Sequence, residues 1–212
     1  MFNKLRYLLI TLLLSLIGMN FILAGCGKDT EEQNPIATSL SDNDKIALWS
    51  KALWEWKEGN GNNAKKVSGM NKALLGLTEL KATEVFIELL LKQPTTFIRH
   101  RSAIALGEIL DPKAIEPLSI SAINDKDPIV RAGSVWALGQ LKAKSKLSLI
   151  VALTKNESIA IQQHAVNALG EIGDRESLPI LNEIINDKTR NQIVIGEAKK
   201  AIEKIQKGEV GK

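Results

Sequence analysis

Side chains that could carry out chemistry are few in this chain. Its 212 residues include two histidines, His100 and His164, and a single cysteine, Cys26. One cysteine excludes an intramolecular disulfide and a cysteine-cluster metal site. The sequence has no HExxH motif, no phosphate-cradling glycine loop and no Ser/His/Asp set that periodicity would bring together. We therefore expect no catalytic residues, no metal, no cofactor and no enzymatic activity, which leaves binding as the task of the folded part.

The cysteine lies where a lipid would be attached. Lys4 and Arg6 form a short basic start, and residues 8–23 are almost wholly apolar. This run is shorter than the ~20 residues that a spanning helix needs, and it ends in small residues, so it predicts a cleaved signal peptide. Leu23-Ala24-Gly25-Cys26 resembles the bacterial lipobox, in which signal peptidase II cuts before a cysteine that carries a diacylglycerol. The alternatives are an uncleaved anchor and a chance small residue pair before the cysteine.

Three segments follow from this interpretation. Residues 1–25 are the cleaved signal peptide, residues 26–40 are a polar, flexible tether, and residues 41–207 are the folded domain. The formal net charge of the whole chain is +4, and removal of the first segment, which holds two cations and no acidic residue, leaves +2. A nearly neutral chain with interspersed charges does not fit a nucleic-acid binder.

The folded domain contains an internal repeat. The triplet Ala-Leu-Gly ends at Gly107, Gly139 and Gly170, spacings of 32 and 31 residues. A period of this size is typical of stacked helix–turn–helix units that bury their apolar faces on one another. Glycine inside a helix costs about 1 kcal/mol relative to alanine, so its recurrence indicates a close approach of neighbouring helices. The final helix carries Glu203 at the equivalent position.

Periodicity and turn residues set the expected helices. Ser41 with Asp44 has the form of a capping box, and the Asp-Pro pairs at 111–112 and 127–128 each place an N-cap before a proline at the first helical position. We divide the repeats into an inner helix with Ala-Leu-Gly followed by an outer helix. The expected helices are 42–57, 64–78, 82–92, 97–110, 112–124, 128–141, 146–153, 159–172, 177–186 and 193–206. The Trp-rich first helix and the lysine-rich last helix would cover the two ends of the stack.

The repeat resembles a known family. Ile98-Arg99 with Ala105-Leu106-Gly107, and Val130-Arg131 with Ala137-Leu138-Gly139, are similar to the short HEAT-like repeat that is also found in phycobilin lyases. The resemblance covers residues 97–187 best. It weakens in the third unit, where Gln162 replaces the arginine and Lys142–Lys146 lacks the Gly/Asp-Pro turn. It implies an all-α, right-handed α-solenoid whose inner helices line a concave, protein-binding surface. Metal oxygenases of this repeat class use His-Glu pairs, but arginine and alanine follow the two histidines here.

The residues opposite the buried stripe of the inner helices are the expected binding surface. They form the columns His100/Ala132/Gln163/Gly196, Ile104/Trp136/Asn167/Lys200 and Ala103/Val135/Val166/Lys199. Our candidates for contact with a partner are His100, Ile104, Trp136, Gln163 and Asn167. Trp136 is the most distinctive, because aromatic residues dominate interface energetics, although it could equally fill space between inner helices. Trp54 is a second candidate, for a partner or the membrane, with packing beneath the tether as the alternative.

These inferences predict a lipoprotein that acts as a non-catalytic, protein-binding scaffold in the bacterial cell envelope. Acyl chains on Cys26 would hold it on the exported side of a membrane. Because Gly27 is not aspartate, that membrane would be the outer membrane of a Gram-negative cell, or otherwise the outer face of the plasma membrane. Two alternatives remain: an accessory or lyase-like protein that binds a small ligand or chromophore in the groove, and a structural assembly lipoprotein that binds through its N-terminal helix.

Overall fold

The computed structural model describes residues 40–57 and 64–210, and in these ranges the regular structure is entirely helical. The α-helices are α3 (Asp42–Trp54), α4 (Ala64–Glu79), α5 (Thr83–Lys92), α6 (Thr96–Ile109), α7 (Ile115–Asn124), α8 (Pro128–Gln140), α9 (Leu147–Leu153), α10 (Ile159–Ile172), α11 (Leu178–Asn186) and α12 (Gln192–Val210). Short 3₁₀ turns at Pro112–Ala114, Lys144–Lys146 and Arg175–Ser177 precede α7, α9 and α11. The expected helices are therefore confirmed to within a few residues, except that the three 3₁₀ turns were not anticipated.

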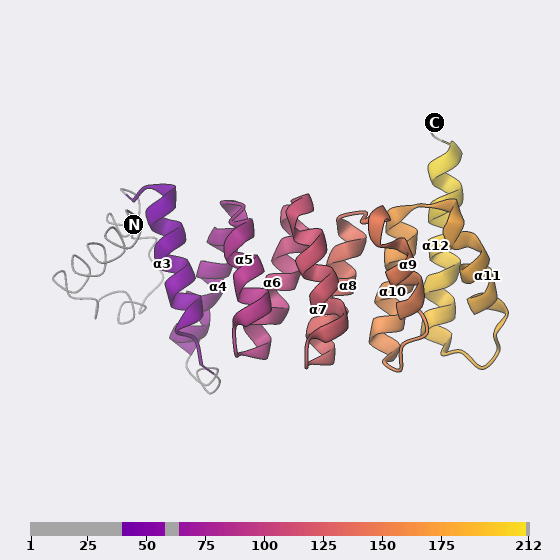
Figure 1. The fold of residues 1–212 in the computed structure, drawn as a ribbon, viewed down its shortest axis with the longest axis horizontal. Helices are drawn as coiled ribbons and strands as arrows, with labels where there is room; N and C mark the ends of the chain where they lie inside the picture. Colours follow the sequence, from indigo (N-terminus) through magenta and orange to yellow (C-terminus); the bar gives the residue numbers. More distant parts are fainter. Residues whose placement is uncertain (1–39, 58–63, 211–212) are drawn as a thin grey trace.

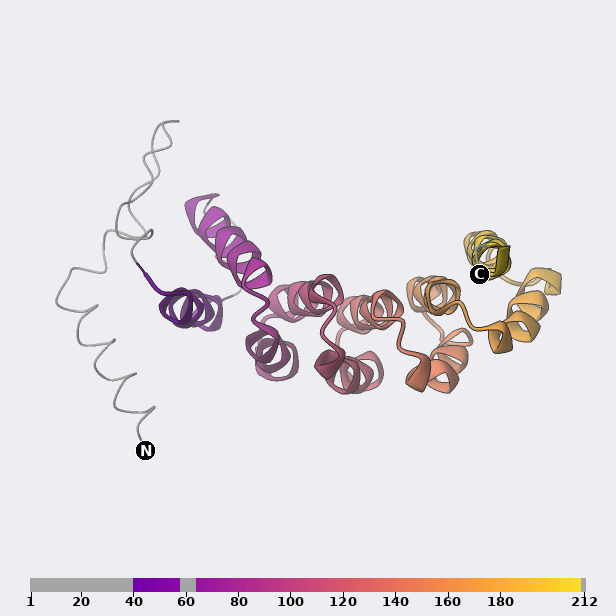
Figure 2. The same ribbon diagram turned by 90° about the horizontal axis from the view of Figure 1, so that it is seen from above.

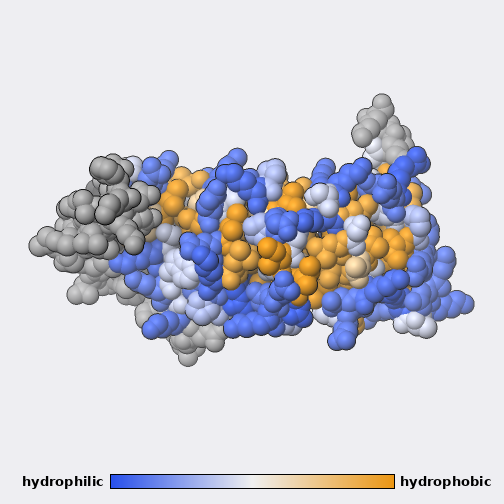
Figure 3. All heavy atoms as spheres, viewed as in Figure 1, coloured by the Kyte–Doolittle hydropathy of each residue, from blue (hydrophilic) through white to orange (hydrophobic). Residues whose placement is uncertain are grey.

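The helices form two layers of a right-handed α-solenoid. Helices α6, α8, α10 and α12 lie side by side in an inner layer, and α5, α7, α9 and α11 form the outer layer (Figures 1 and 2). The end helices α4 and α12 turn toward the same side of the inner layer, which makes that side concave (Figure 2). Figure 3 shows the side formed by the outer helices, where hydrophobic residues gather over α5 and α7 between hydrophilic edges.

Each outer helix packs closely against the inner helix that follows it, not the one before it. The close pairs are α5 with α6, α7 with α8, α9 with α10 and α11 with α12. The division into an inner helix followed by an outer helix describes the order along the chain, whereas the closest backbone contacts join each outer helix to the next inner helix. Turn residues indicate where helices end, but they do not indicate which neighbouring helix each one packs against.

The helix ends are set largely by local hydrogen bonds. The Ser41 hydroxyl accepts a bond from the Asp44 backbone N–H at 3.3 Å, which confirms Ser41 as the N-cap of α3; it also donates to the Asp44 carboxylate at 2.6 Å. Asp111 and Asp127 each accept from the backbone two residues on. In the turn after α8, Lys142 adopts a left-handed conformation with φ 48°, at the position that Leu110 and Gly173 hold after α6 and α10. This turn does depart from the others, because Ala143 offers no side-chain cap where Asp111 and Asp174 each accept a backbone hydrogen bond.

The repeated glycines mark the contacts between inner helices. A Cβ atom at Gly139 would lie 2.8 Å from the Cα of Ala168, and one at Gly170 would lie 2.9 Å from the Cα of Ala201. Each glycine therefore faces the alanine of the next repeat's Ala-Leu-Gly or its equivalent. The prediction that close helix approach explains these glycines is confirmed. The resulting Gly–Ala ladder fixes the spacing of α6, α8, α10 and α12, and hence the shape of the concave side.

The core lies between the two layers. Leu106, Leu138 and Leu169, one from each Ala-Leu-Gly, are fully buried. A buried ion pair joins the ends of α6 and α7: Arg99 donates from Nε to Asp125 at 2.8 Å and from Nη2 to the other carboxylate oxygen at 3.0 Å. Burial acts to raise the pKa of Asp125, but hydrogen bonds from Arg99 and the Asp127 backbone outweigh it and hold the pKa below its ordinary value.

Candidate functional site

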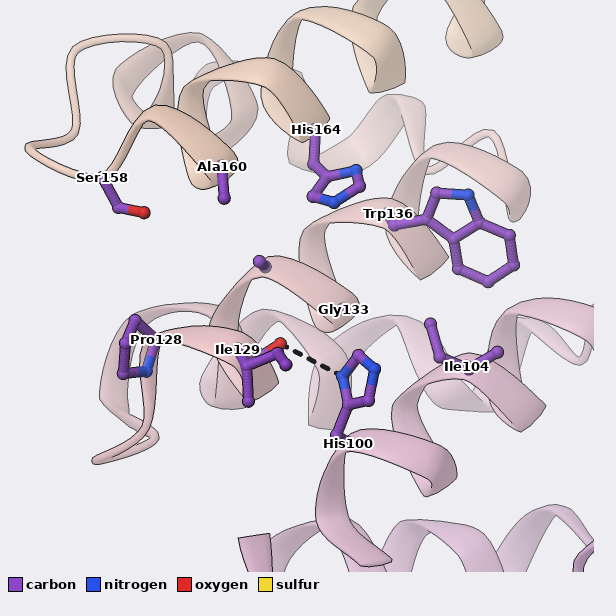
Figure 4. Close-up of a pocket in the computed structure, with 10 residues that line it drawn as sticks. His100, Ile104, Pro128, Ile129, Gly133, Trp136, Ser158, Ala160 and His164 are labelled. Carbon is purple, nitrogen blue, oxygen red and sulfur yellow. Dashed lines mark hydrogen bonds between the residues drawn. The ribbon is translucent and has the colours of Figure 1, made fainter. Parts of the chain in front are cut away.

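An open pocket lies on the concave side, where α6, α8 and α10 meet. Its volume is about 520 Å³. The ten residues that line it are His100, Ile104, Pro128, Ile129, Ala132, Gly133, Trp136, Ser158, Ala160 and His164. Most of these side chains are apolar, and the two imidazoles point toward each other from α6 and α10 on either side of α8 (Figure 4). The pocket is therefore suited to an apolar group that meets a few polar atoms.

Gly133 makes room for the first imidazole. A Cβ atom at this position would lie 2.8 Å from Nδ1 of His100, so any larger residue would displace the ring. The same Nδ1 lies 3.1 Å from the carbonyl oxygen of Ile129. Because a carbonyl only accepts, this contact places the proton of a neutral ring on Nδ1 and leaves Nε2 as an acceptor. His100 is thus held in one orientation by α8.

Trp136 both packs and lines the pocket. A Cβ atom at Gly107 would lie 2.8 Å from Cζ3 of the Trp136 ring, so the indole of α8 sits over the glycine of α6. The side chain is only partly buried, and it lines the pocket together with Ile104. Both interpretations of Trp136 therefore describe its position: it fills the space over a neighbouring helix, and it presents aromatic surface to the pocket.

Burial favours the neutral form of both histidines. Burial lowers the pKa of His100 below its ordinary value, against the opposing effect of the Ile129 carbonyl. Burial also lowers the pKa of His164, and the charge of His100 lowers it further. The carboxylate of Glu197 acts to raise the pKa of His164. The pocket therefore presents neutral, hydrogen-bonding rings beside apolar surface, and it becomes positively charged only on acidification.

The structure brings three of the five predicted contact residues together. His100, Ile104 and Trp136 line one pocket, whereas Gln163 and Asn167 on α10 are partly buried and do not line it. The column Ala103, Val135 and Val166 was wrongly placed on the groove floor, because all three side chains are fully buried. Each inner helix touches neighbours on both sides as well as an outer helix, so its buried arc is wider than one helical stripe.

Sequence reasoning missed other residues that belong to the pocket. Ile129, at the first turn of α8, is 52% exposed, and His164 faces the first histidine although the two occupy different columns of the repeat. Gly133 on α8 occupies the same repeat position as His164 on α10. This glycine leaves space between the histidines of α6 and α10, and its alignment with His164 was the sequence signal that could have identified the pocket.

The remaining predicted sites are only partly within the described ranges. Leu23, Ala24, Gly25 and Cys26 lie outside the described residues, so lipid attachment stays a prediction. Trp54 is partly buried and packs against the core.

Among the described helices, none is both long and apolar enough to cross a bilayer. Within the same ranges, no three His, Cys, Asp or Glu side chains are grouped as they would be around a metal ion.

This architecture, stacked helix pairs with a concave inner layer, defines the class of α-solenoid repeat proteins. Residues 119–203 match the family model for HEAT repeats. This match covers 85 of the 212 residues and identifies HEAT-like repeats in that part of the chain. The chain is 32% identical over 124 residues to "Uncharacterized phycocyanin operon protein Z" of Pseudanabaena tenuis, a match that covers 55% of this chain and 61% of that protein.

Two further similarities widen the comparison. The chain is 25% identical over 162 residues to deoxyhypusine hydroxylase-B of Oryza sativa subsp. japonica, covering 74% of this chain and 53% of the hydroxylase. Its fold matches the complex of CpcE and CpcF of phycocyanin lyase from Nostoc sp. PCC7120 with a TM-score of 0.55 at 19% identity, covering 88% of this chain and 71% of that chain. The chain thus spans between half and two thirds of the length of the phycocyanin operon protein and of the hydroxylase.

The similarity to deoxyhypusine hydroxylase corrects one expectation. The sequence was interpreted as that of a protein without enzymatic activity, yet a relative over most of this chain's length is an enzyme. The motifs found missing include those of other folds and the His-Glu pairs of HEAT-like metal oxygenases, and their absence does not exclude catalysis on a HEAT-like scaffold. The fold and the comparisons together show an α-solenoid with a HEAT-repeat match over residues 119–203 and with sequence similarity to a phycocyanin operon protein and to deoxyhypusine hydroxylase.

Proposed function

We propose that this protein binds another protein through the concave side of its solenoid, with an apolar segment of the partner seated in the pocket beside Trp136. The supporting observation is the pocket itself, an open hollow of about 520 Å³ in which neutral imidazoles, an indole and the half-exposed Ile129 converge from three helices. Apolar pockets with a few oriented polar groups are the common form of binding sites. Aromatic side chains in such pockets carry much of the energy of protein interfaces.

The solved complex of CpcE and CpcF supports a protein partner by analogy, since in it a similar fold is assembled with a second protein. The pocket has no net charge at neutral pH when both imidazoles are neutral. We therefore expect apolar contact to supply the affinity and the acceptor Nε2 of His100 to supply orientation. A donor on the partner, such as a hydroxyl or backbone N–H, would satisfy that nitrogen.

A photo-crosslinking amino acid at Ile129 tests the proposal. This side chain lines the pocket yet is 52% exposed, so its replacement leaves the core intact. Ultraviolet irradiation of native membranes should attach a discrete partner protein at Ile129, and the adduct should fade when Trp136→Ala is added. Ile123 on α7 is the matched control, because it is 56% exposed on the outer layer. The same adduct from Ile123, or none from Ile129, would contradict binding at the pocket.

We further propose that acyl chains on Cys26 hold the protein on the exported side of a bacterial membrane. This part rests on the lipobox-like Leu23-Ala24-Gly25-Cys26 and the apolar run before it. Two or three acyl chains give stable anchoring at about 0.8 kcal/mol per buried methylene. Cys26→Ser should therefore move the protein from the membrane to the soluble fraction after cell lysis. Continued membrane retention with an uncleaved N-terminus would show that the apolar run itself is the anchor.

A further inference from the structure

Three successive loops that lead into inner helices have the same local form. Asp125 before α8, Asn156 before α10 and Asp187 before α12 are spaced 31 residues apart. In each case the side-chain Oδ1 accepts a hydrogen bond from the backbone N–H two residues on, at 2.9, 2.9 and 3.0 Å. The three residues are therefore structurally equivalent, and at this position the middle loop has an amide where the other two have a carboxylate.

A guanidinium pairs with the loop carboxylate in both flanking units. Arg99 binds Asp125 through Nε and Nη2 at 2.8 and 3.0 Å, and the two side chains are only 6% and 7% exposed. In the third unit Gln162 stands at the position of the arginine, and Arg190 supplies the guanidinium instead. It donates from Nε to Asp187 at 3.3 Å and from Nη1 to the side-chain oxygen of Gln162 at 3.4 Å. The pairing is thus kept even where the arginine moves to another position.

The middle unit keeps the arginine but has no carboxylate for it. Arg131 is partly buried and donates from Nη1 to the carbonyl oxygen of Asp125 at 2.8 Å. The amide oxygen of Asn156 already accepts from the backbone of Ser158, and the other end of that side chain is an NH₂ group that only donates. Within residues 40–57 and 64–210, no acidic side chain forms an ion pair with Arg131. Its guanidinium is therefore held in place but lacks the partner that Arg99 and Arg190 have.

An open hollow of about 610 Å³ lies at this guanidinium. Its lining is mostly polar and consists of Arg131, Ala152, Lys155, Asn156, Glu157 and Ser158. Two cations face one acidic residue there, and the exposed Glu157 forms no ion pair with Arg131 among the described residues. Lys155 has only a distant and exposed partner, Glu183 at 3.8 Å. The hollow is therefore net positive and rich in hydrogen-bond donors.

We propose that this hollow binds a carboxylate group from outside the chain, held by Arg131 as Arg99 holds Asp125. Lys155 adds attraction from the rim of the hollow. Arginine and a carboxylate form two parallel, charge-assisted hydrogen bonds, and the pair at Arg99 shows that an arginine at this repeat position adopts that geometry. We call the hollow the carboxylate site.

The carboxylate site goes beyond the proposed function, because it is a second hollow with a different chemistry. It lies at the loop between α9 and α10, and it adjoins the apolar pocket, since Ser158 lines both. An acidic side chain next to the apolar residue of a partner segment therefore fits the two hollows together. A free carboxylic acid offers the same chemistry, and the experiments below distinguish these two sources.

Acetate is the direct probe. The full chain, labelled with ¹⁵N in its arginines and kept in a neutral detergent, would be titrated with sodium acetate and, as a control for ionic strength, with sodium chloride. The Nε–H signal of Arg131 should shift toward that of Arg99 and saturate at roughly millimolar acetate. The signal of the exposed Arg101 should stay in place. The absence of a saturable shift beyond that in chloride, or at least tenfold tighter binding of inorganic phosphate, would overturn the proposal.

Two substitutions copy the flanking units. Asn156→Asp supplies an internal carboxylate, as Asp125 does, and should abolish the acetate-dependent shift of Arg131. Asn186→Asp adds the same charge at the exposed end of α11 and should leave that shift unchanged. Arg131→Gln reproduces Gln162 of the third unit, so the fold should tolerate it, and acetate should no longer raise Tm above its value in chloride. Undiminished acetate binding in Asn156→Asp, or an undiminished rise in Tm in Arg131→Gln, would refute the site.

The charge of Glu157 gives an independent test. Its carboxylate lines the same hollow as Arg131 and opposes the entry of an anion. Glu157→Gln should therefore tighten acetate binding several-fold, because it removes a like charge at short range. Weaker acetate binding in this variant would contradict the placement of the anion at Arg131.

Crosslinking from Ile129 identifies the source of the carboxylate. If the group belongs to the partner segment, the Ile129 adduct should fade in Asn156→Asp and persist in Asn186→Asp. An adduct that persists in both variants, together with acetate binding, would assign the site to a free carboxylic acid. An Ile129 adduct without acetate binding would reject the carboxylate site and retain the proposed function. Acetate binding without any adduct would do the reverse.

Discussion

Addition of a single methyl group at Gly139 tests the Gly–Ala ladder. In Gly139→Ala the new Cβ would lie 2.8 Å from Cα and 2.9 Å from Cβ of Ala168, and ordinary contact begins at 3.4 Å. The backbones of α8 and α10 would therefore have to separate by roughly 0.6 Å, because neither atom belongs to a flexible side chain. Every other contact along that seam would loosen with them.

Two opposing effects set the magnitude. Overpacking of this kind costs about 1–3 kcal/mol, and replacement of a helical glycine by alanine returns about 1 kcal/mol. The net destabilisation is then about 1 kcal/mol, or a fall in Tm of about 2–4 °C for a domain of this size. Gly69→Ala in α4 is the matched control, because nothing lies within 4 Å of its added Cβ. The control should gain roughly 0.5–1 kcal/mol.

Thermal and urea unfolding, followed by circular dichroism at 222 nm, would measure both variants against the unchanged protein. The predicted outcome is a difference in sign: Gly139→Ala melts lower and Gly69→Ala melts higher. If both substitutions raised Tm by similar amounts, the close approach of α8 and α10 at this glycine would be refuted, and with it the explanation of the repeated triplet.

Two further predictions concern buried charge and titration. Arg99→Met should lower the free energy of unfolding by about 3 kcal/mol in urea titrations, because it leaves Asp125 buried without its ion-pair partner; a loss below 1 kcal/mol would mean that the carboxylate finds other support. The lowered pKa values of His100 and His164 mean that the unfolded chain binds more protons than the folded chain near and below the ordinary pKa of 6.5. Stability should therefore fall as the pH falls through that range, and His100→Gln with His164→Gln should remove most of this slope between pH 7.5 and 5.5. An unchanged slope in the double variant would assign the effect to other groups.

Much of the fold was predictable because its signals are local. Caps such as Asp111 and Asp127, and the spacing of the Ala-Leu-Gly triplets, depend on residues a few positions apart, and the structure confirms each of them. The left-handed turn at Lys142 was not predictable, because nothing in its sequence demands positive φ. Lys142 adopts there a left-handed conformation, as Gly173 does at the equivalent position after α10.

The candidate site was predictable only in part, because it depends on the relation between neighbouring repeats. Trp136 and His100 were found from one helix face, but a helical wheel does not tell how far each repeat is rotated relative to the next. Contacts with the helices on both sides bury Val135, which the column pattern had exposed, and His164 on α10 faces His100 on α6. Enzymatic activity was excluded by motif, and similarity to an enzyme over most of the chain shows that such an exclusion does not hold.

The ladder between inner helices does not extend to the N-terminal pair. At Gly76 of α4 the neighbour is the indole ring of Trp49 on α3, not an alanine of α6, and α4 is tilted relative to the following inner helices (Figure 2). Because each unit of a solenoid touches only its neighbours, mechanical load passes from one junction to the next. Tension applied through the N-terminus would thus bend the α4–α6 junction first. We expect such a junction to let the N-terminal end move while the geometry from α6 to α12 stays as it is.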